Sequence, residues 1–195
     1  MSLEDDAISE LRATAHPVRL RMLSLLTGAA LSAAELAREL DITQANASYH
    51  LRTLAKAGQV EVATTESVRG GQAKKYRYRH PEERAPGQQP RRSVRVADAE
   101  FRQYLEALHH ELVRRAEHRV DGPAISSDAE VWLTPDVWRR ARDLVKEASM
   151  LVHDEALRPH APGSVHVNFQ TELFPMRDER DVQDGEQDGE QDGAQ

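Results

Sequence analysis

Apolar side chains recur at helical spacing in the first part of the chain and predict two helices before residue 30. The first spans about residues 5–15 and is broken by His16-Pro17. Pro17 then fits the first turn of the second helix, where its missing N–H is not needed. This second helix is expected to run to about Leu26, with Gly28 following as its stop, and its inner stripe consists of Leu20, Leu23 and Leu26.

The next two helices form the most informative pattern. Ser32 and Glu35 match a capping box, in which the serine caps the helix and the glutamate stands at its third position. After a break at residues 41–43, Thr43 can cap a further helix over residues 44–57, which Gly58 ends. The inward positions of the two helices are Leu36, Ala37, Leu40, Ala47, Leu51 and Leu54. Two short helices joined by a three-residue turn are the helix-turn-helix pattern.

Beyond Gly58 the apolar period changes from that of a helix to that of a strand. Val60 and Val62 alternate with polar residues, and turn-forming residues are frequent over positions 64–72. From residue 74 to 79, tyrosines on one face alternate with basic side chains on the other, namely Lys75, Arg77 and Arg79. This pattern predicts a hairpin with a basic face, at the position that the wing occupies in a winged helix.

The second half of the chain predicts a long helix followed by a small βαβ unit. The long helix carries a continuous apolar stripe from Phe101 to Val120 and is stopped by Asp121-Gly122-Pro123. A short strand around residues 131–133, a helix from the Thr134 cap to about residue 157, and a one-sided strand over residues 165–173 then follow in that order.

Together these segments predict an α+β fold in four parts. They are a winged helix-turn-helix domain at residues 5–80, a linker at 81–95, a dimerisation and candidate effector region at 96–176, and an acidic tail at 177–195. The tail repeats Gln-Asp-Gly three times between residues 183 and 193, and the repeats contain no apolar residue. We therefore expect the tail to be disordered.

The formal net charge of −7 is distributed unevenly along the chain. Residues 178–195 hold 8 acidic residues and 1 basic residue, which accounts for the whole net charge. Residues 11–80 instead hold 11 basic and 5 acidic residues, a net charge of +6. A basic segment inside an acidic protein suits a polyanionic partner, although ordinary solvated surfaces also show this composition.

The composition excludes several classes of site. The chain has no cysteine, which fits a reducing compartment and excludes thiolate metal sites and redox switches. It has no apolar run near the ~20 residues that span a bilayer, and its first residues are acidic rather than those of a signal peptide. We therefore expect a cytoplasmic protein with no membrane partner. Because the chain has neither a Gly-rich phosphate loop nor a Gly-x-Ser-x-Gly elbow, we expect no enzymatic activity and no cofactor.

Two runs of sequence resemble the ArsR family of bacterial transcription regulators. Residues 11–23 contain His-Pro-x-Arg-x-x-x-Leu, and residues 36–54 contain Ser-x-His-Leu and are followed by Ala57-Gly58. The resemblance covers about residues 5–80. It implies a homodimer that binds double-stranded operator DNA, most often as a repressor, and that releases or rebinds the DNA on an effector signal, for which a small molecule is one candidate.

This sequence departs from that family in ways that bear on function. Many members carry a Cys-containing metal motif in the recognition-helix region, and its absence here excludes control by thiolate-bound metal. Many members also have arginine where Tyr49 stands, so their base preference does not carry over to this chain. The region beyond residue 95 is longer than in the small metal sensors and resembles the extended C-terminal halves of some members.

The helix over residues 44–57 is predicted to lie in the major groove, where the first turns of a recognition helix reach base edges. Glutamine and asparagine pair with adenine and arginine pairs with guanine, whereas basic residues of the hairpin hold the DNA backbone. The residues predicted to contact DNA are Thr43, Gln44, Ala45, Asn46, Ser48, Tyr49 and Arg52 in the helix and Lys74, Lys75 and Arg77 in the hairpin. A solvated helix face and an edge strand protected by lysine and arginine are the alternative interpretations.

The long helix is too apolar along one stripe to face water, which predicts a dimer interface formed by Phe101, Tyr104, Leu105, Leu108 and Leu112. His110 and His118 lie two turns apart on this helix, near Glu111 and Glu117, and some members of the resembled family bind zinc through such a helix. Zinc needs at least three well-placed ligands, and Arg114 puts a cation on the same face. We therefore interpret the histidines as surface or interface residues and predict no metal site.

Sequence-specific operator binding is the function that these patterns predict. The first alternative is a winged-helix module that binds protein rather than DNA, and the basic hairpin and polar recognition helix argue against it. The second alternative is an enzyme whose C-terminal half binds a substrate, and no residues in the sequence support it.

Overall fold

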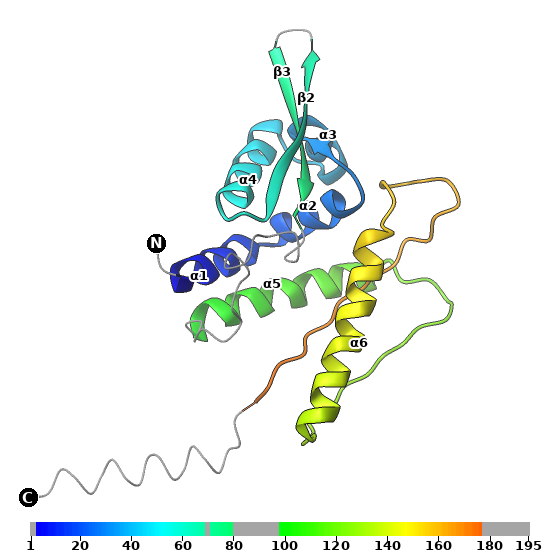
Figure 1. The fold of residues 1–195 in the computed structure, drawn as a ribbon. Helices are drawn as coiled ribbons and strands as arrows, with labels where there is room; N and C mark the ends of the chain where they lie inside the picture. The colour runs from blue at the N-terminus through cyan, green and yellow to red at the C-terminus, as the bar shows by residue number, and fades with distance from the viewer. Residues whose placement is uncertain (1–2, 69–70, 80–97, 177–195) are drawn as a thin grey trace, which may run out of the picture.

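The structure is a computed structural model that describes residues 3–68, 71–79 and 98–176 (Figure 1). Its first half contains α1 (Leu3–Thr14), α2 (Pro17–Gly28), β1 (Leu31–Ser32), α3 (Ala33–Leu40), α4 (Gln44–Lys56), β2 (Val60–Val68) and β3 (Gly71–Tyr78). Its second half contains α5 (Asp98–Ala116) and α6 (Pro135–Asp154). The α+β class predicted from the sequence is confirmed.

Side-chain caps begin three of the helices where the sequence predicts them. The Ser32 hydroxyl accepts from the backbone N–H of Glu35 at 3.3 Å, while the Glu35 carboxylate accepts from the Ser32 N–H at 2.7 Å, which completes the capping box of α3. The Thr43 hydroxyl accepts from the Asn46 N–H at 3.2 Å and caps α4, and Thr134 caps α6 in the same way. These bonds satisfy N–H groups that a helix leaves unpaired, so they favour the observed helix starts.

The turn between α3 and α4 is short because Asp41 adopts left-handed backbone, with φ 52°, directly after the last residue of α3. The N–H of Ile42 then donates to the Ala37 carbonyl oxygen at 3.0 Å. The Ile42 side chain packs against the core, so an apolar contact anchors the turn that joins the two helices.

The core lies between α2, α3, α4 and the start of β2. Its buried side chains are Met22, Leu26, Leu36, Ala37, Leu40, Ala47, Leu51, Leu54 and Val60. Each fully buried leucine or methionine contributes roughly 1.5–3 kcal/mol of hydrophobic free energy. Because all the inward positions predicted for α3 and α4 belong to this set, the core determines which face of α4 points outward.

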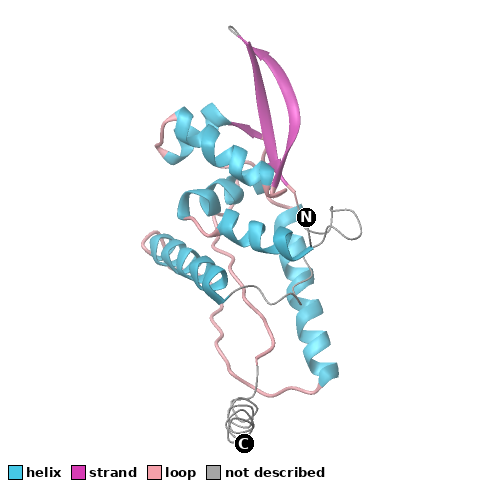
Figure 2. Ribbon diagram, turned by 90° about the vertical axis from the view of Figure 1, so that its left-hand side faces the viewer, coloured by secondary structure: helices cyan, strands magenta, loops and turns pink. Residues whose placement is uncertain are grey.

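The strands form one antiparallel sheet in the order β1-β3-β2. Tyr76 in β3 lies between Leu31 of β1 and Val62 of β2, and both Tyr76 and Tyr78 pack against the core. A shift in register between Val62 and Thr64 marks a bulge, beyond which the described side chains of β2 are exposed. Figure 2 shows the β2–β3 hairpin projecting from one end of the molecule.

The long helix α5 lies against α1 and α2 of the same chain. Its most buried positions are Ala107 and Glu111, at 6% and 1% exposure, and Glu100 accepts a hydrogen bond from Arg12 of α1 at 2.6 Å. These buried positions precede most positions of the predicted apolar stripe by one residue. The buried face of α5 therefore lies about 100° around the helix from the predicted stripe. Leu112 is exposed, and the half-buried members of that stripe are Phe101, Tyr104, Leu105 and Leu108. A dimer interface on this stripe stays a prediction.

The predicted βαβ unit is wrong for this structure, because residues 131–133 and 165–173 form no strands. Polar side chains attach the second segment to α5 instead. Asn168 accepts from the Arg115 guanidinium at 3.2 Å, and Glu172 accepts from the Tyr104 hydroxyl at 3.2 Å. Alternating apolar residues predict one covered face, but a strand also needs a neighbouring strand for its backbone N–H and C=O groups. Among the described residues, no strand lies beside residues 165–173 to pair with their backbone N–H and C=O groups.

The ends of α5 and α2 also differ from the sequence prediction, and α6 ends at Asp154 rather than near residue 157. Helix α5 ends at Ala116, so Val120 lies beyond it and is 82% exposed. Gly28 is the last residue of α2 rather than a stop beyond it. A Cβ at Gly28 would overlap the carbonyl oxygen of Leu157, so the absence of a side chain lets the chain after α6 approach the end of α2.

The predicted linker at 81–95 and acidic tail at 177–195 lie outside the described residues. No helix in the described part of the chain is long and apolar enough to cross a membrane.

Candidate nucleic-acid interface

Helix α4 presents one face to solvent, because Ala47, His50, Leu51 and Leu54 hold the opposite face in the core. Ser48 is half-buried, and the other predicted residues of this helix and its cap are exposed: Thr43, Gln44, Ala45, Asn46, Tyr49 and Arg52. The structure therefore places the residues predicted to contact bases along the outward surface of one helix and its cap, here called the α4 face.

The α4 face also contains a residue that the sequence prediction omitted. Lys56 is exposed and stands four residues after Arg52, so the two side chains lie on the same side of the helix, one turn apart. This spacing could have identified Lys56 from the sequence. Thr43 has a structural role as well, because its hydroxyl accepts the capping hydrogen bond of α4.

The hairpin holds two of its predicted cations in ion pairs. Lys75 Nζ lies 3.1 Å from Glu66 and 3.8 Å from Glu35, and these carboxylates raise the pKa of Lys75, mainly through the hydrogen bond to Glu66. Arg77 lies 2.5 Å from Glu61, the residue directly opposite it in the β2–β3 ladder. Because carboxylates already neutralise these cations, Lys75 and Arg77 attract phosphate less than their sequence positions suggest.

Lys74 differs from its neighbours in the hairpin. It is exposed, it stands opposite Thr65 in the ladder, and it makes no ion pair with the described residues. Of the three predicted hairpin residues, Lys74 is therefore the one best placed to contact a phosphate. The sequence shows the same acids and bases, but their pairing depends on strand register.

Two histidines meet beneath the α4 face. The rings of His16 and His50 are 4.8 Å apart, and the Tyr49 ring packs edge-on against His50 at 5.4 Å. His16 Nδ1 accepts the Val18 N–H at 3.1 Å and thereby caps α2. Burial lowers the pKa of both histidines, and the positive charge of Arg19 lowers each further. The contact between α2 and α4 therefore favours neutral imidazoles, a role that the sequence pattern does not reveal.

Residues 14–63 match the family model of a helix-turn-helix domain. The match runs from the last residue of α1 into β2 and includes α2, α3, α4 and the turn between the last two. This chain carries a helix-turn-helix domain. DNA-binding transcription regulators use this domain and place its second helix in the major groove, and the α4 face lies on the corresponding helix of this chain. A comparison with curated proteins found no match.

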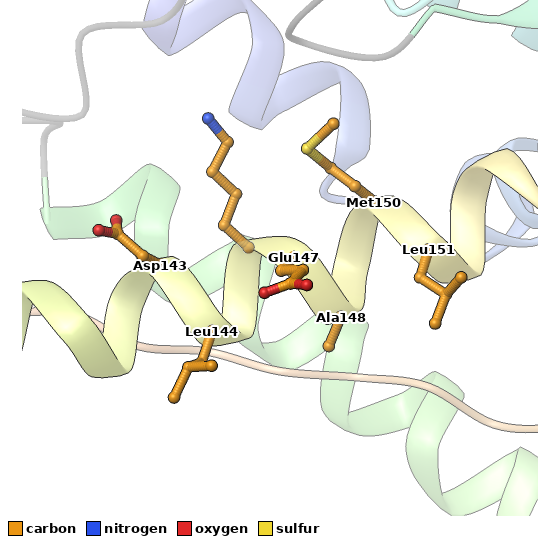
Figure 3. Close-up of a pocket in the computed structure, with 7 residues that line it drawn as sticks. Asp143, Leu144, Glu147, Ala148, Met150 and Leu151 are labelled. Carbon is orange, nitrogen blue, oxygen red and sulfur yellow. The ribbon is translucent and has the colours of Figure 1, made fainter.

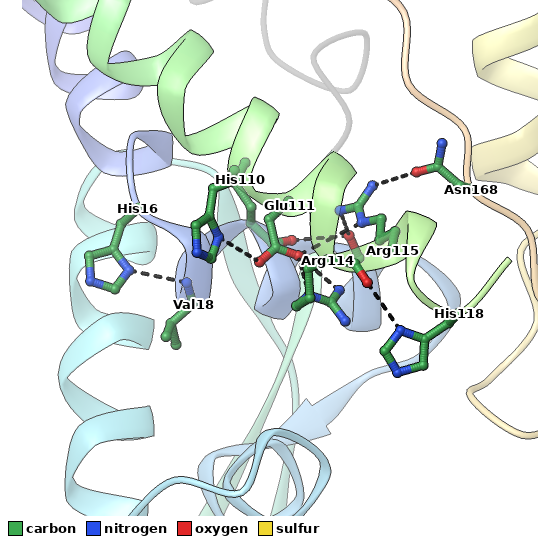
Figure 4. A network of polar contacts seen from close by, with 10 residues as sticks. His16, Val18, His110, Glu111, Arg114, Arg115, His118 and Asn168 are labelled. Atoms are coloured by element: carbon green, nitrogen blue, oxygen red, sulfur yellow. Dashed lines mark hydrogen bonds and ion pairs between the residues drawn. The ribbon is translucent and has the colours of Figure 1, made fainter. Parts of the chain in front are cut away.

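A buried carboxylate joins the helix-turn-helix domain to the rest of the chain (Figure 4). Glu111 accepts two hydrogen bonds from the Arg114 guanidinium, at 2.8 and 3.0 Å, and lies 3.8 Å from Arg115. Arg115 also donates to the Ser24 hydroxyl of α2 at 3.4 Å and to Asn168 at 3.2 Å. This group of charges therefore contacts α2, α5 and the segment that follows α6. In the sequence pattern, Glu111 stands out only as a neighbour of His110 and His118.

His110 of α5 and His118 just beyond the helix belong to no cluster of metal-ligating side chains among the described residues. Among the described residues, no three or more His, Asp or Glu side chains are grouped so that they could hold a metal ion. His118 Nδ1 donates to the Arg114 carbonyl oxygen at 3.0 Å. His110 lies 4.0 Å from Glu111, whose carboxylate already pairs with arginine.

Proposed function

We propose that this protein is a sequence-specific transcription regulator that binds double-stranded operator DNA as a homodimer. The observation that carries the proposal is the α4 face, a row of exposed polar side chains on the second helix of a matched helix-turn-helix domain. The mode of action that we propose is repression by blocking polymerase, as the resemblance of residues 5–80 to ArsR-family regulators implies.

In this proposal α4 lies in the major groove and the β2–β3 hairpin serves as the wing. Gln44 and Asn46 stand at the start of α4, where amide side chains can bond the edge of adenine, and Arg52 can bond guanine. Lys56 and Lys74 would neutralise phosphates, which adds affinity but little sequence preference. A dimer would present two α4 faces to half-sites about 34–36 Å apart along the DNA.

The test begins with selection of bound fragments from a random DNA pool by the full-length protein, which should enrich a sequence with two-fold symmetry. Arg52→Ala should weaken binding to that operator by about 1–3 kcal/mol and leave binding to a scrambled duplex nearly unchanged. Arg119→Ala removes an exposed arginine beyond α5 and is the matched control. If no sequence is enriched and no duplex binds at low salt, the proposal fails and a winged-helix module that binds protein becomes the better interpretation.

A further inference from the structure

Helix α6 is amphipathic, yet none of its residues is buried. Its apolar side chains fall mainly into two sets on neighbouring faces. One set is half-buried and includes Trp138, Val145 and Val152. The other set, here called the α6 seam, consists of Val137, Ala141, Leu144, Ala148 and Leu151.

The large side chains of the α6 seam are open to solvent. Val137, Leu144 and Leu151 are 50%, 57% and 63% exposed. Figure 3 shows Leu144, Ala148 and Leu151 projecting from the same side of α6, where they line a shallow hollow. A continuous apolar stripe along a helix of 20 residues is unfavourable in water, so it marks a surface that another element covers.

The spacing of the α6 seam specifies a helix as the covering element. Its residues follow one another in steps of four, three, four and three, which is the spacing of the contact line between two paired helices. Small alanines alternate with the larger valine and leucines along the seam. The small alanines between the larger side chains let the backbones of two paired helices approach each other closely.

Charged residues beside the seam indicate which helix that is. Arg140 and Glu147 stand on the same edge of the seam, seven residues apart, which is too far for a pair within α6. Neither residue makes an ion pair with the described part of the chain. Two antiparallel copies of α6 centred on Leu144 would bring Arg140 of each copy beside Glu147 of the other. Parallel copies would instead bring Arg140 beside Val145, which offers no charge.

We propose that the α6 seam is the contact between two copies of this chain, with antiparallel helices and a two-fold axis beside Leu144. Val137 of each copy then meets Leu151 of the other, so one surface complements itself, as a two-fold interface requires. This contact lies on a different helix from the α5 stripe that the sequence predicts. The inference names the surface that forms the homodimer of the proposed function, and it holds whether or not the chain binds DNA.

Disulfide crosslinking tests this geometry without background, because the chain has no cysteine. In the full-length protein, Leu144→Cys places two thiols beside the two-fold axis and should give a covalent dimer on mild oxidation. Leu151→Cys alone should not, because it faces Val137 of the other copy, whereas Val137→Cys combined with Leu151→Cys should. Equal crosslinking of the two single variants would mean parallel helices, and no crosslinking of any variant would mean that the seam makes no contact. Either result would overturn the proposal.

Sedimentation equilibrium of the full-length protein tests the predicted pairing of Arg140 with Glu147 between two copies. Arg140→Glu should raise the dimer dissociation constant about tenfold, because it creates two repulsive contacts. The double variant Arg140→Glu, Glu147→Arg should restore dimerisation, since the two residues meet only between copies. Arg139→Glu, on the far side of α6, is the matched control.

Leu144→Asp should raise the dissociation constant at least a hundredfold, roughly the effect of burying unpaired charge. Circular dichroism should show that each variant keeps the helix content of the unaltered protein. An unaltered chain that stays monomeric would contradict the proposal. A Leu144→Asp variant that stays dimeric would also contradict it and would favour the α5 stripe as the dimer interface. Operator binding by the unaltered protein is measured separately, so failure of the DNA proposal is distinguishable from failure of this one.

Discussion

At the scale of single residues, the pair formed by His16 and His50 has a direct consequence for stability. His50 is buried, and its Nδ1 atom has no hydrogen-bond partner among the described residues. A proton on either ring would place a charge beside the other ring and near Arg19, in a setting where water cannot fully solvate it. The folded state therefore holds both imidazoles neutral.

The free energy of unfolding should accordingly fall as the pH decreases below about 6.5. The pKa of both histidines is lowered in the folded chain, so the unfolded chain binds more protons in this range, and stability is complete above the unfolded pKa and declines below it. Hydrogen bonds with Ser32 lower the pKa of Glu35, whose own contribution is lost only near and below pH 4.5. Urea denaturation at pH 7.5 and 5.5 therefore isolates the histidines.

The control for this effect is an exposed histidine. His50→Gln should reduce the difference between the two urea midpoints, whereas His166→Gln should leave the difference unchanged because His166 is exposed. A His50→Gln variant that keeps the full difference would show that other groups cause the pH dependence.

At the scale of elements, strand register in the β2–β3 hairpin determines which of its basic residues pair with glutamates. Lys75 and Arg77 meet glutamates from the same sheet or from α3, whereas Lys74 points into a position without such a partner among the described residues. Neighbouring lysines in one strand should therefore differ in what they contribute to DNA binding, although the sequence pattern predicts contacts from both.

Lys74→Ala should weaken binding to operator and scrambled duplexes alike, because phosphate contacts carry no sequence information. It should also lower the dependence of the logarithm of affinity on the logarithm of salt concentration, by about one unit for each phosphate that a monomer no longer neutralises. Lys75→Ala is the matched control and should change this slope less. Salt titrations followed by fluorescence anisotropy give both slopes, and a larger change for Lys75→Ala would reverse the assignment.

At the scale of the whole molecule, the carboxylate of Glu111 connects parts of the chain that are distant in sequence. It is 1% exposed, and through Arg115 it links α5 to Ser24 in the helix-turn-helix domain and to Asn168 beyond α6. The helix-turn-helix domain and the C-terminal segment therefore share one group of charges around the buried Glu111.

Glu111→Ala should lower the free energy of unfolding by about 1–3 kcal/mol, because it leaves the half-buried Arg114 and Arg115 without their counter-charge. Urea denaturation measures this change, and faster hydrogen exchange over residues 165–176 should accompany it. Glu117→Ala removes an exposed glutamate just beyond α5 and should have little effect. If both variants unfold at the same urea concentration, the charge network does not hold the two halves together.

Sequence patterns identified the helix-turn-helix domain and most of its candidate DNA-contacting residues because the signals for both are local. A capping residue and its partner are three positions apart, and an apolar stripe repeats within one or two turns, so Ser32, Glu35 and Leu51 reveal their roles without any knowledge of the fold. The outward face of α4 follows from its inward face. Periodicity could have added Lys56 for the same reason.

Contacts between distant segments determine the remaining features. Register in the hairpin determines that Arg77 pairs with Glu61, and docking of α5 on α1 and α2 buries Glu111 rather than the more apolar Leu112. Residues 165–173 alternate like a strand, yet they contact α5 through side chains because no neighbouring strand in the described chain offers backbone partners. The period of apolar residues determines which face of a helix or strand favours burial. Which segment buries that face is determined by contacts between residues far apart in the sequence.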